Sequence, residues 1–83
     1  MTKNSTNIEL VKKIDRLKFL RESVSLELSD ISKRTKIPTQ TLKDIESKKF
    51  ENLPPSPIGR SFINQYQKQV ESHFKDTEFE VIS

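Results

Sequence analysis

The first quarter of the chain has apolar residues at the spacing of an amphipathic helix. They recur at steps of three and four, with an arginine on the same stripe: Leu10, Ile14, Leu17, Leu20 and Arg21. This periodicity is typical of a helix that buries one face. Thr6, followed by Glu9 three residues later, forms a capping box in which both side chains bond to otherwise unpaired amide groups. The pattern therefore predicts a first helix from about Thr6 to Ser23.

Two shorter helices are predicted to follow. One runs from about residue 28 to 35, and Pro38 fits the first position of the next, where an amide hydrogen would have no partner. Ser32, Ile37 and Leu42 follow one another at intervals of five. This spacing lets a small residue on one helix approach the next helix across a short turn, which is the arrangement of a helix-turn-helix. The inner faces of the two helices are predicted to consist of Leu28, Ile31, Leu42 and Ile45.

A proline-rich link separates these helices from a fourth one. Phe50 and Leu53 are expected to dock the link on the core, and the prolines at 54–55 keep it extended because each fixes its own backbone angle. Ser56 is the predicted cap and Pro57 the first helical residue of the fourth helix.

The fourth helix carries a broad apolar stripe. Its members lie within about 140° of one another at 100° per residue: Ile58, Phe62, Ile63, Tyr66 and Val70. Aromatic residues at helical spacing usually fill a core, and this interpretation of Phe62 and Tyr66 stands beside one in which they contact a partner. Part of the stripe is expected to line the core, and in the second interpretation its Ile58 and Phe62 edge remains available for docking.

These elements predict an all-α fold, a compact four- to five-helix bundle containing a helix-turn-helix of the phage-repressor kind. Residues 1–6 are expected to be a flexible N-terminus and residues 7–73 the helix-turn-helix domain. Residues 74–83 are expected to be a short last turn or a disordered tail or linker. Within them, Phe79 and Val81 alternate with acidic residues, so a short strand also remains open.

Composition restricts the chemistry. A chain of 83 residues makes one small domain. The absence of cysteine and the single histidine argue against disulfides and zinc clusters, and a single glycine argues against a glycine-rich phosphate loop. We expect no metal, no cofactor, no small-molecule substrate and no catalysis. No apolar stretch approaches the roughly 20 residues that span a bilayer, so a soluble, cytoplasmic monomer is expected.

Charge is distributed unevenly along the chain. The net charge is +3, but residues 1–49 hold twelve basic and seven acidic residues, whereas residues 50–83 hold three and five. The basic surface therefore belongs to the helix-turn-helix half. Four carboxylates interspersed with lysines are expected to form surface ion pairs: Asp15, Glu22, Asp30 and Glu46.

The order of residues beyond the helix-turn-helix carries a family resemblance. Its most specific members are Arg34-Thr35-Lys36-Ile37, Leu42, Ile45-Glu46, Phe50-Glu51-Asn52-Leu53-Pro54, Arg60-Ser61-Phe62-Ile63 and Tyr66. From about residue 17 to 70, the chain resembles the N-terminal cytoplasmic domain of the bacterial cell-shape protein RodZ, which is related to Xre-type helix-turn-helix proteins.

The resemblance implies an adaptor that docks on the actin-like filament protein MreB at the inner face of the cytoplasmic membrane. It places the contact on the fourth helix, at Phe62 and Tyr66, with help from the second helix and with Arg60 at a position that is usually basic. The chain departs from the family pattern where Ser25, Lys48 and Ser61 replace glycines, and where Gly59 replaces an apolar residue. Family members also continue into a transmembrane helix.

The alternative function is sequence-specific DNA binding of the Xre type. It would use Gln40, Thr41 and Lys43 on the outer face of the third helix for base contacts. The expected phosphate contacts are Lys33, Arg34, Lys36 and Lys48. Asp44 and Glu46 would bring negative charge near that surface, and a solvated helix face explains the same residues. A structural module within a longer protein is the third possibility.

Overall fold

Four α-helices and one 3₁₀-helix make up the described part of the fold. The computed structural model describes the backbone of residues 2–82 and the side chains of residues 8–75. The elements in chain order are α1 (Thr2–Ser23), α2 (Leu28–Thr35), α3 (Thr39–Glu46), η1 (Phe50–Asn52) and α4 (Ile58–Ile82). No strand occurs in this described part of the chain. The predicted all-α, helix-turn-helix bundle is confirmed.

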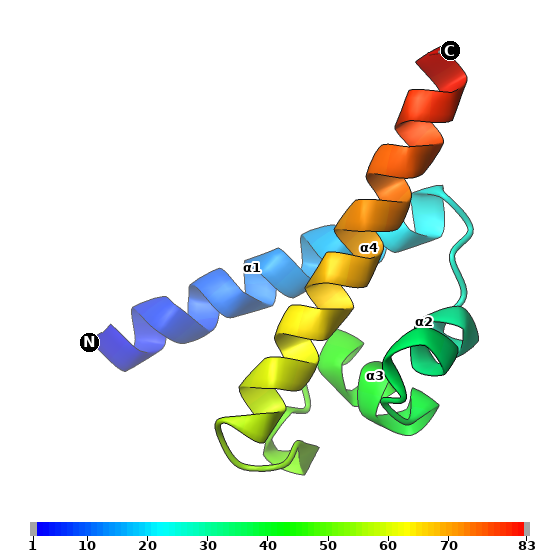
Figure 1. Ribbon diagram of the computed structural model, residues 1–83. Helices are drawn as coiled ribbons and strands as arrows, with labels where there is room; N and C mark the ends of the chain where they lie inside the picture. Colours follow the sequence, from blue (N-terminus) through cyan, green and yellow to red (C-terminus); the bar gives the residue numbers. More distant parts are fainter. Residues whose placement is uncertain (1, 83) are drawn as a thin grey trace.

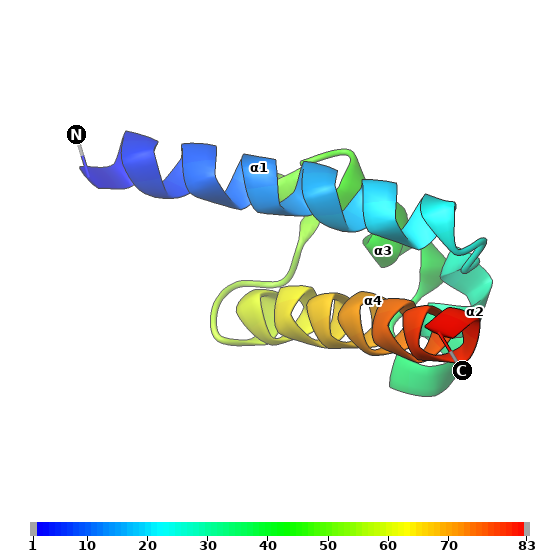
Figure 2. The same cartoon turned by 90° about the horizontal axis from the view of Figure 1, so that it is seen from above.

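Two long helices and two short ones share one core. Figure 1 shows α1 and α4 crossing each other, with the α2–α3 pair beside them, and Figure 2 shows that α1 and α4 lie in separate layers. α4 packs against both α1 and α2, while α3 packs against α1, α2 and η1. The beginning of α1 and the end of α4 extend beyond this packed region in different directions (Figure 1). None of the helices, within the residues described, is long and apolar enough to cross a membrane.

The core draws on every α-helix. Its fully or nearly buried members are Ile14, Leu17, Leu26, Ile31, Ile37, Leu42, Ile45, Tyr66 and Val70. The predicted inner faces of α1, α2, α3 and α4 are therefore confirmed at most positions, because burial follows the three- and four-residue spacing of each apolar stripe. Phe50 and Leu53 are half-buried against this cluster, as expected of residues that dock the proline-rich link.

The turn between α2 and α3 is fixed by short hydrogen bonds. Lys36 has a left-handed backbone (φ 65°), and its amide donates to the carbonyl of Ser32 at 2.7 Å. The Ser32 hydroxyl donates to the carbonyl of Ile37 at 2.5 Å, and the Ile37 amide donates to Thr35 Oγ1 at 3.2 Å. The five-residue interval from Ser32 to Ile37 thus allows a hydrogen bond between these two residues across the turn, in addition to the close approach of the helices.

Some predicted boundaries are wrong. α1 begins at Thr2, so Thr6 and Glu9 lie inside the helix and do not cap its start. α4 begins at Ile58, one residue later than predicted. It continues to Ile82, which decides the open question for residues 79–81 in favour of a helix; their side chains lie outside the described residues. The division of the chain at residues 6 and 73 stays a prediction, although both helices run through those positions.

Two of the three residues that replace family glycines have a left-handed backbone conformation. Ser25 (φ 57°) and Lys48 (φ 60°) both adopt the left-handed conformation that glycine adopts most easily. Ser61 lies within α4, where no such conformation is required. Gly59 is needed for space, because a Cβ atom there would come within 2.3 Å of the Pro54 carbonyl oxygen. The first turn of α4 therefore packs directly on the proline corner.

Candidate functional site

Three charged or polar side chains meet at the centre of the bundle. Arg21 on α1 donates from Nε to Glu46 Oε2 at 2.6 Å and from Nη2 to Oε1 at 3.0 Å. Tyr66 on α4 donates its hydroxyl to Glu46 Oε2 at 2.7 Å, and Arg21 Nη1 also donates to the carbonyl of Leu26 at 2.7 Å. Glu46 ends α3, so this Arg21–Glu46–Tyr66 network joins three helices and the connector after α1.

The network corrects the prediction that Glu46 forms a surface ion pair. Its side chain is only 6 % exposed and that of Arg21 13 %. The sequence holds a signal for this pair, because Arg21 lies on the apolar stripe of α1 and Glu46 directly follows inward-facing Ile45. Opposite charges on two apolar faces indicate a buried pair. Asp15, by contrast, pairs with Lys48 at the surface as expected.

The network also sets the protonation of its members. Burial, followed by the hydrogen bond to Glu46 and its charge, raises the pKa of the Tyr66 hydroxyl well above its usual value. Burial alone would lower the pKa of Arg21, but the hydrogen bond and charge of Glu46 outweigh it, and the pKa is raised. Tyr66 is thus held as a neutral donor and Arg21 as a cation.

The predicted docking residues do not all share one surface. Tyr66 is completely buried, so it cannot contact a partner while the domain is folded, and its place in the predicted contact set is wrong. Ile58 is 53 % exposed and Phe62, one turn later, is half-buried. Ser61 and Gln65 border them on the same edge, at about 300° and 340° when Ile58 is at 0°. This α4 edge (Ile58, Ser61, Phe62 and Gln65) is partly apolar and carries no charge.

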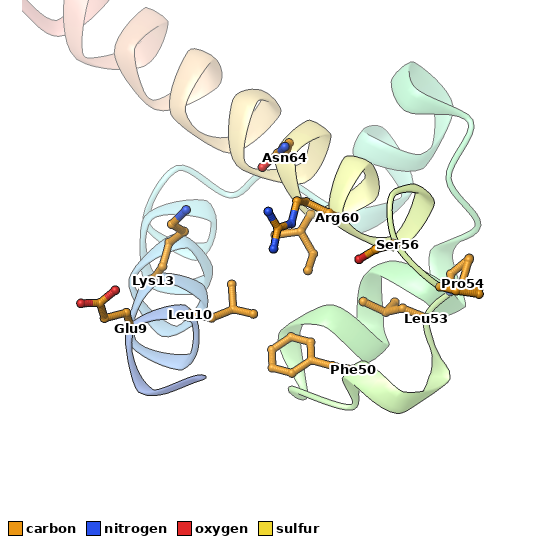
Figure 3. Close-up of a pocket in the computed structure, with 12 residues that line it drawn as sticks. Glu9, Leu10, Lys13, Phe50, Leu53, Pro54, Ser56, Arg60 and Asn64 are labelled. Atoms are coloured by element: carbon orange, nitrogen blue, oxygen red, sulfur yellow. The ribbon is translucent and has the colours of Figure 1, made fainter. Parts of the chain in front are cut away.

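Arg60 lies on the other side of α4. It is about 200° from Ile58 around the helix axis, and its guanidinium extends toward α1, in a groove between α1, the proline-rich link and α4 (Figure 3). The groove has a volume of about 670 Å³, and the residues lining it include Leu10, Lys13, Phe50, Leu53, Arg60 and Ile63. Glu9 also lines the groove, and Lys13 donates to Gln67 Oε1 at 3.2 Å, so the two cations lie beside a carboxylate and one of them already has a hydrogen-bond partner.

The helix-turn-helix presents a separate polar surface. Gln40 and Lys43 are exposed on α3 and Thr41 is half-buried beside them. The Gln40 amide donates to Asp44 Oδ1 at 3.2 Å, so part of its bonding capacity is used within the helix. The cations expected at phosphates are exposed on α2 and the turn: Lys33, Arg34 and Lys36. Lys48 differs from them, because it is bonded to Asp15.

Comparison with known proteins identifies the family. A family model described as a helix-turn-helix domain matches residues 16–72. The chain belongs to this family. The match spans well over half of the chain and includes the helix-turn-helix, the buried network and the α4 edge. No curated protein and no solved structure matches the chain.

Proposed function

We propose that this helix-turn-helix domain is a non-enzymatic protein-interaction adaptor of the RodZ type, which docks on an actin-like, MreB-type filament protein in support of cell shape. The docking surface is the α4 edge, and the observation that carries the proposal is the 53 % exposure of Ile58. An apolar side chain held on a rigid helix can be buried by a partner at little cost in conformational entropy.

The residue order beyond the helix-turn-helix supports this partner. The proline-rich link and the first turns of α4 carry much of the most specific part of the RodZ resemblance, and Gly59 is the position among them that departs from the family pattern. Gly59 packs against the Pro54 carbonyl, which fixes where α4 begins and therefore where Ile58 and Phe62 lie. Because Tyr66 is buried in the core, we assign the contact to Ile58 and Phe62. This is one helical turn closer to the start of α4 than the pair expected from the resemblance, Phe62 and Tyr66.

The α4 edge can be tested by one substitution with a closely matched control. We expect Ile58→Glu to weaken binding of a purified MreB-type protein at least about tenfold, since anchor residues at interface centres contribute more than 1.4 kcal/mol. Ile8→Glu changes the same residue type on α1 at nearly the same exposure, 54 % against 53 % for Ile58. It should leave this binding unchanged. Equal binding by both variants and the wild type would refute the docking surface.

DNA binding is the second candidate, and one observation favours it. Lys33, Arg34, Lys36 and Lys43 are exposed, and none of them forms an ion pair with a described side chain. Such a group of cations can neutralise phosphates and produce strongly salt-dependent binding.

A titration against a pool of duplex sequences separates the two candidates. A sequence-specific regulator predicts a preferred site whose affinity falls in Gln40→Ala and Lys43→Glu. An adaptor predicts at most weak binding that is equal across sequences and lost near physiological salt. The Ile58→Glu substitution should not affect either DNA result, because Ile58 lies away from the α3 face.

A further inference from the structure

Two of the three large apolar side chains that stand exposed in the described part of the chain share one face of α1. Phe19 is 70 % exposed and Ile8 is 54 % exposed. At 100° per residue they lie at about 140° and 120° from Ile14, which is fully buried. They are therefore on the side of α1 that faces away from the core, about 16 Å apart along the helix. Figure 2 shows α1 running along the edge of the molecule.

Cations lie between these two side chains. Lys12 and Arg16 are at about 160° and 200° on the same face and are both exposed. Among the described side chains, neither forms a hydrogen bond or an ion pair. We call Ile8, Lys12, Arg16 and Phe19 the outer α1 face.

The acidic residues near this face lie at its borders. Asp15 lies at about 100° and is bonded to Lys48. Glu22, at its border, lies 3.7 Å from the guanidinium of Arg21. Glu9 borders the other side and contributes to the groove between α1 and α4. The outer α1 face therefore combines a net positive charge with two exposed apolar side chains.

We propose that the outer α1 face binds an anionic lipid surface. Lys12 and Arg16 would lie at the headgroups, and Phe19 and Ile8 would enter the boundary with the acyl chains, as in interfacial helices that have Lys and Arg beside aromatic and aliphatic residues. A duplex nucleic acid matches the cations but offers no apolar environment to Phe19. A lipid headgroup layer matches both features, which decides between the two polyanions.

Binding to vesicles tests this surface in the full chain. We expect co-sedimentation with vesicles made of equal parts of phosphatidylcholine and phosphatidylglycerol, and none with phosphatidylcholine alone. Binding should fall steeply as salt is raised, because the attraction to anionic headgroups is screened. Phe19→Glu should lower the partition constant about tenfold or more, since it removes the largest apolar group and adds repulsion.

The α4 edge supplies the matched control. Ile58→Glu introduces the same charge at another exposed apolar position, and it should bind these vesicles like the wild type. The lipid proposal is independent of the α4 partner. The Phe19→Glu variant should bind vesicles more weakly and still bind the MreB-type protein, whereas the Ile58→Glu variant should bind vesicles and bind the MreB-type protein more weakly. Circular dichroism should show that both variants keep their helices.

Several outcomes would overturn the proposal. They are equal vesicle binding by Phe19→Glu and the wild type, equal binding to the two lipid compositions, or no wild-type binding at low salt. Two further results would assign the face to another occupant. These are self-association without vesicles that Phe19→Glu abolishes, and duplex DNA binding that Phe19→Glu weakens as much as a Lys12→Glu, Arg16→Glu double variant does.

Discussion

The Arg21–Glu46–Tyr66 network makes the strongest prediction about stability. Tyr66→Phe removes one hydroxyl and leaves the aromatic ring in place. Glu46 then keeps its two bonds to Arg21 but loses the 2.7 Å bond from Tyr66. Hydrogen bonds to charged groups contribute about 1.5–3 kcal/mol. We therefore expect the free energy of unfolding to fall by about that amount.

This loss is large for so small a domain. With 83 residues, the total free energy of unfolding should be about 4–12 kcal/mol. At roughly 4–8 °C per kcal/mol, Tyr66→Phe should lower Tm by roughly 10 °C. Glu46→Ala should cost more, about 3–5 kcal/mol, because it leaves the Arg21 guanidinium buried without its partner. Thermal and urea unfolding followed by far-UV circular dichroism measure both losses.

A double-mutant cycle tests the coupling directly. In a Glu46→Ala background, Tyr66→Phe should cost less than half of what it costs in the wild type, because the acceptor is already gone. Asp15→Asn is the control: it breaks an ion pair whose side chains are 33 % and 56 % exposed, and it should cost less than about 1 kcal/mol. A Tm change below about 2 °C for Tyr66→Phe, or full additivity in the cycle, would refute the role given to the network.

Three further predictions concern pH and the backbone. Because the folded pKa of Tyr66 is raised above the usual 10.0, its contribution is complete below pH 10 and is lost as pH rises toward the folded pKa. Urea unfolding should show stability falling above pH 10 by up to about 1.4 kcal/mol per pH unit, and Tyr66→Phe should lack this component. Gly59→Ala should destabilise the domain by about 1–3 kcal/mol, because its Cβ would overlap the Pro54 carbonyl, whereas Ser61→Ala on the same helix should be nearly neutral; similar Tm values for the two would contradict the close packing. Ser25→Gly should raise the free energy of unfolding by about 1 kcal/mol, since glycine relieves a left-handed backbone, and an unchanged urea midpoint would argue against that strain.

Residue spacing was sufficient to predict much of the fold. The bounds of α2, the inner faces at Ile31, Leu42 and Ile45, and the docking of Phe50 followed from local periodicity and turn chemistry. The left-handed backbone at Ser25 and Lys48 occurs at two positions where the family has glycine, but it was not predicted from the residues present. The start of α1 was not predicted, because a capping motif cannot show whether the helix continues through it.

The candidate site was predicted less completely. The sequence identified the α4 stripe but could not divide it between the core and the surface, because that division depends on how α4 is rotated against α1 and α2. In the structure, Tyr66 points into the core and bonds to Glu46, whereas Ile58 is exposed. Arg60 lies on the opposite side of α4 from Ile58, in the groove beside α1. The outer α1 face was not predicted. Phe19 and Ile8 lie outside the apolar stripe of the first helix, and only the packing of α1 shows that both side chains are exposed.

The sequence by itself determined the helix-turn-helix, since its helices and its turn depend on residues at most a few positions apart. Only the tertiary structure decided which side chains are available for function. Arg21 is 25 residues before Glu46 in the sequence, and Tyr66 is 20 residues after it. The three side chains meet because three helices pack around the buried Glu46 carboxylate. That packing fixes the rotation of α4 and α1, and the rotation of each helix determines which of its apolar residues water can reach.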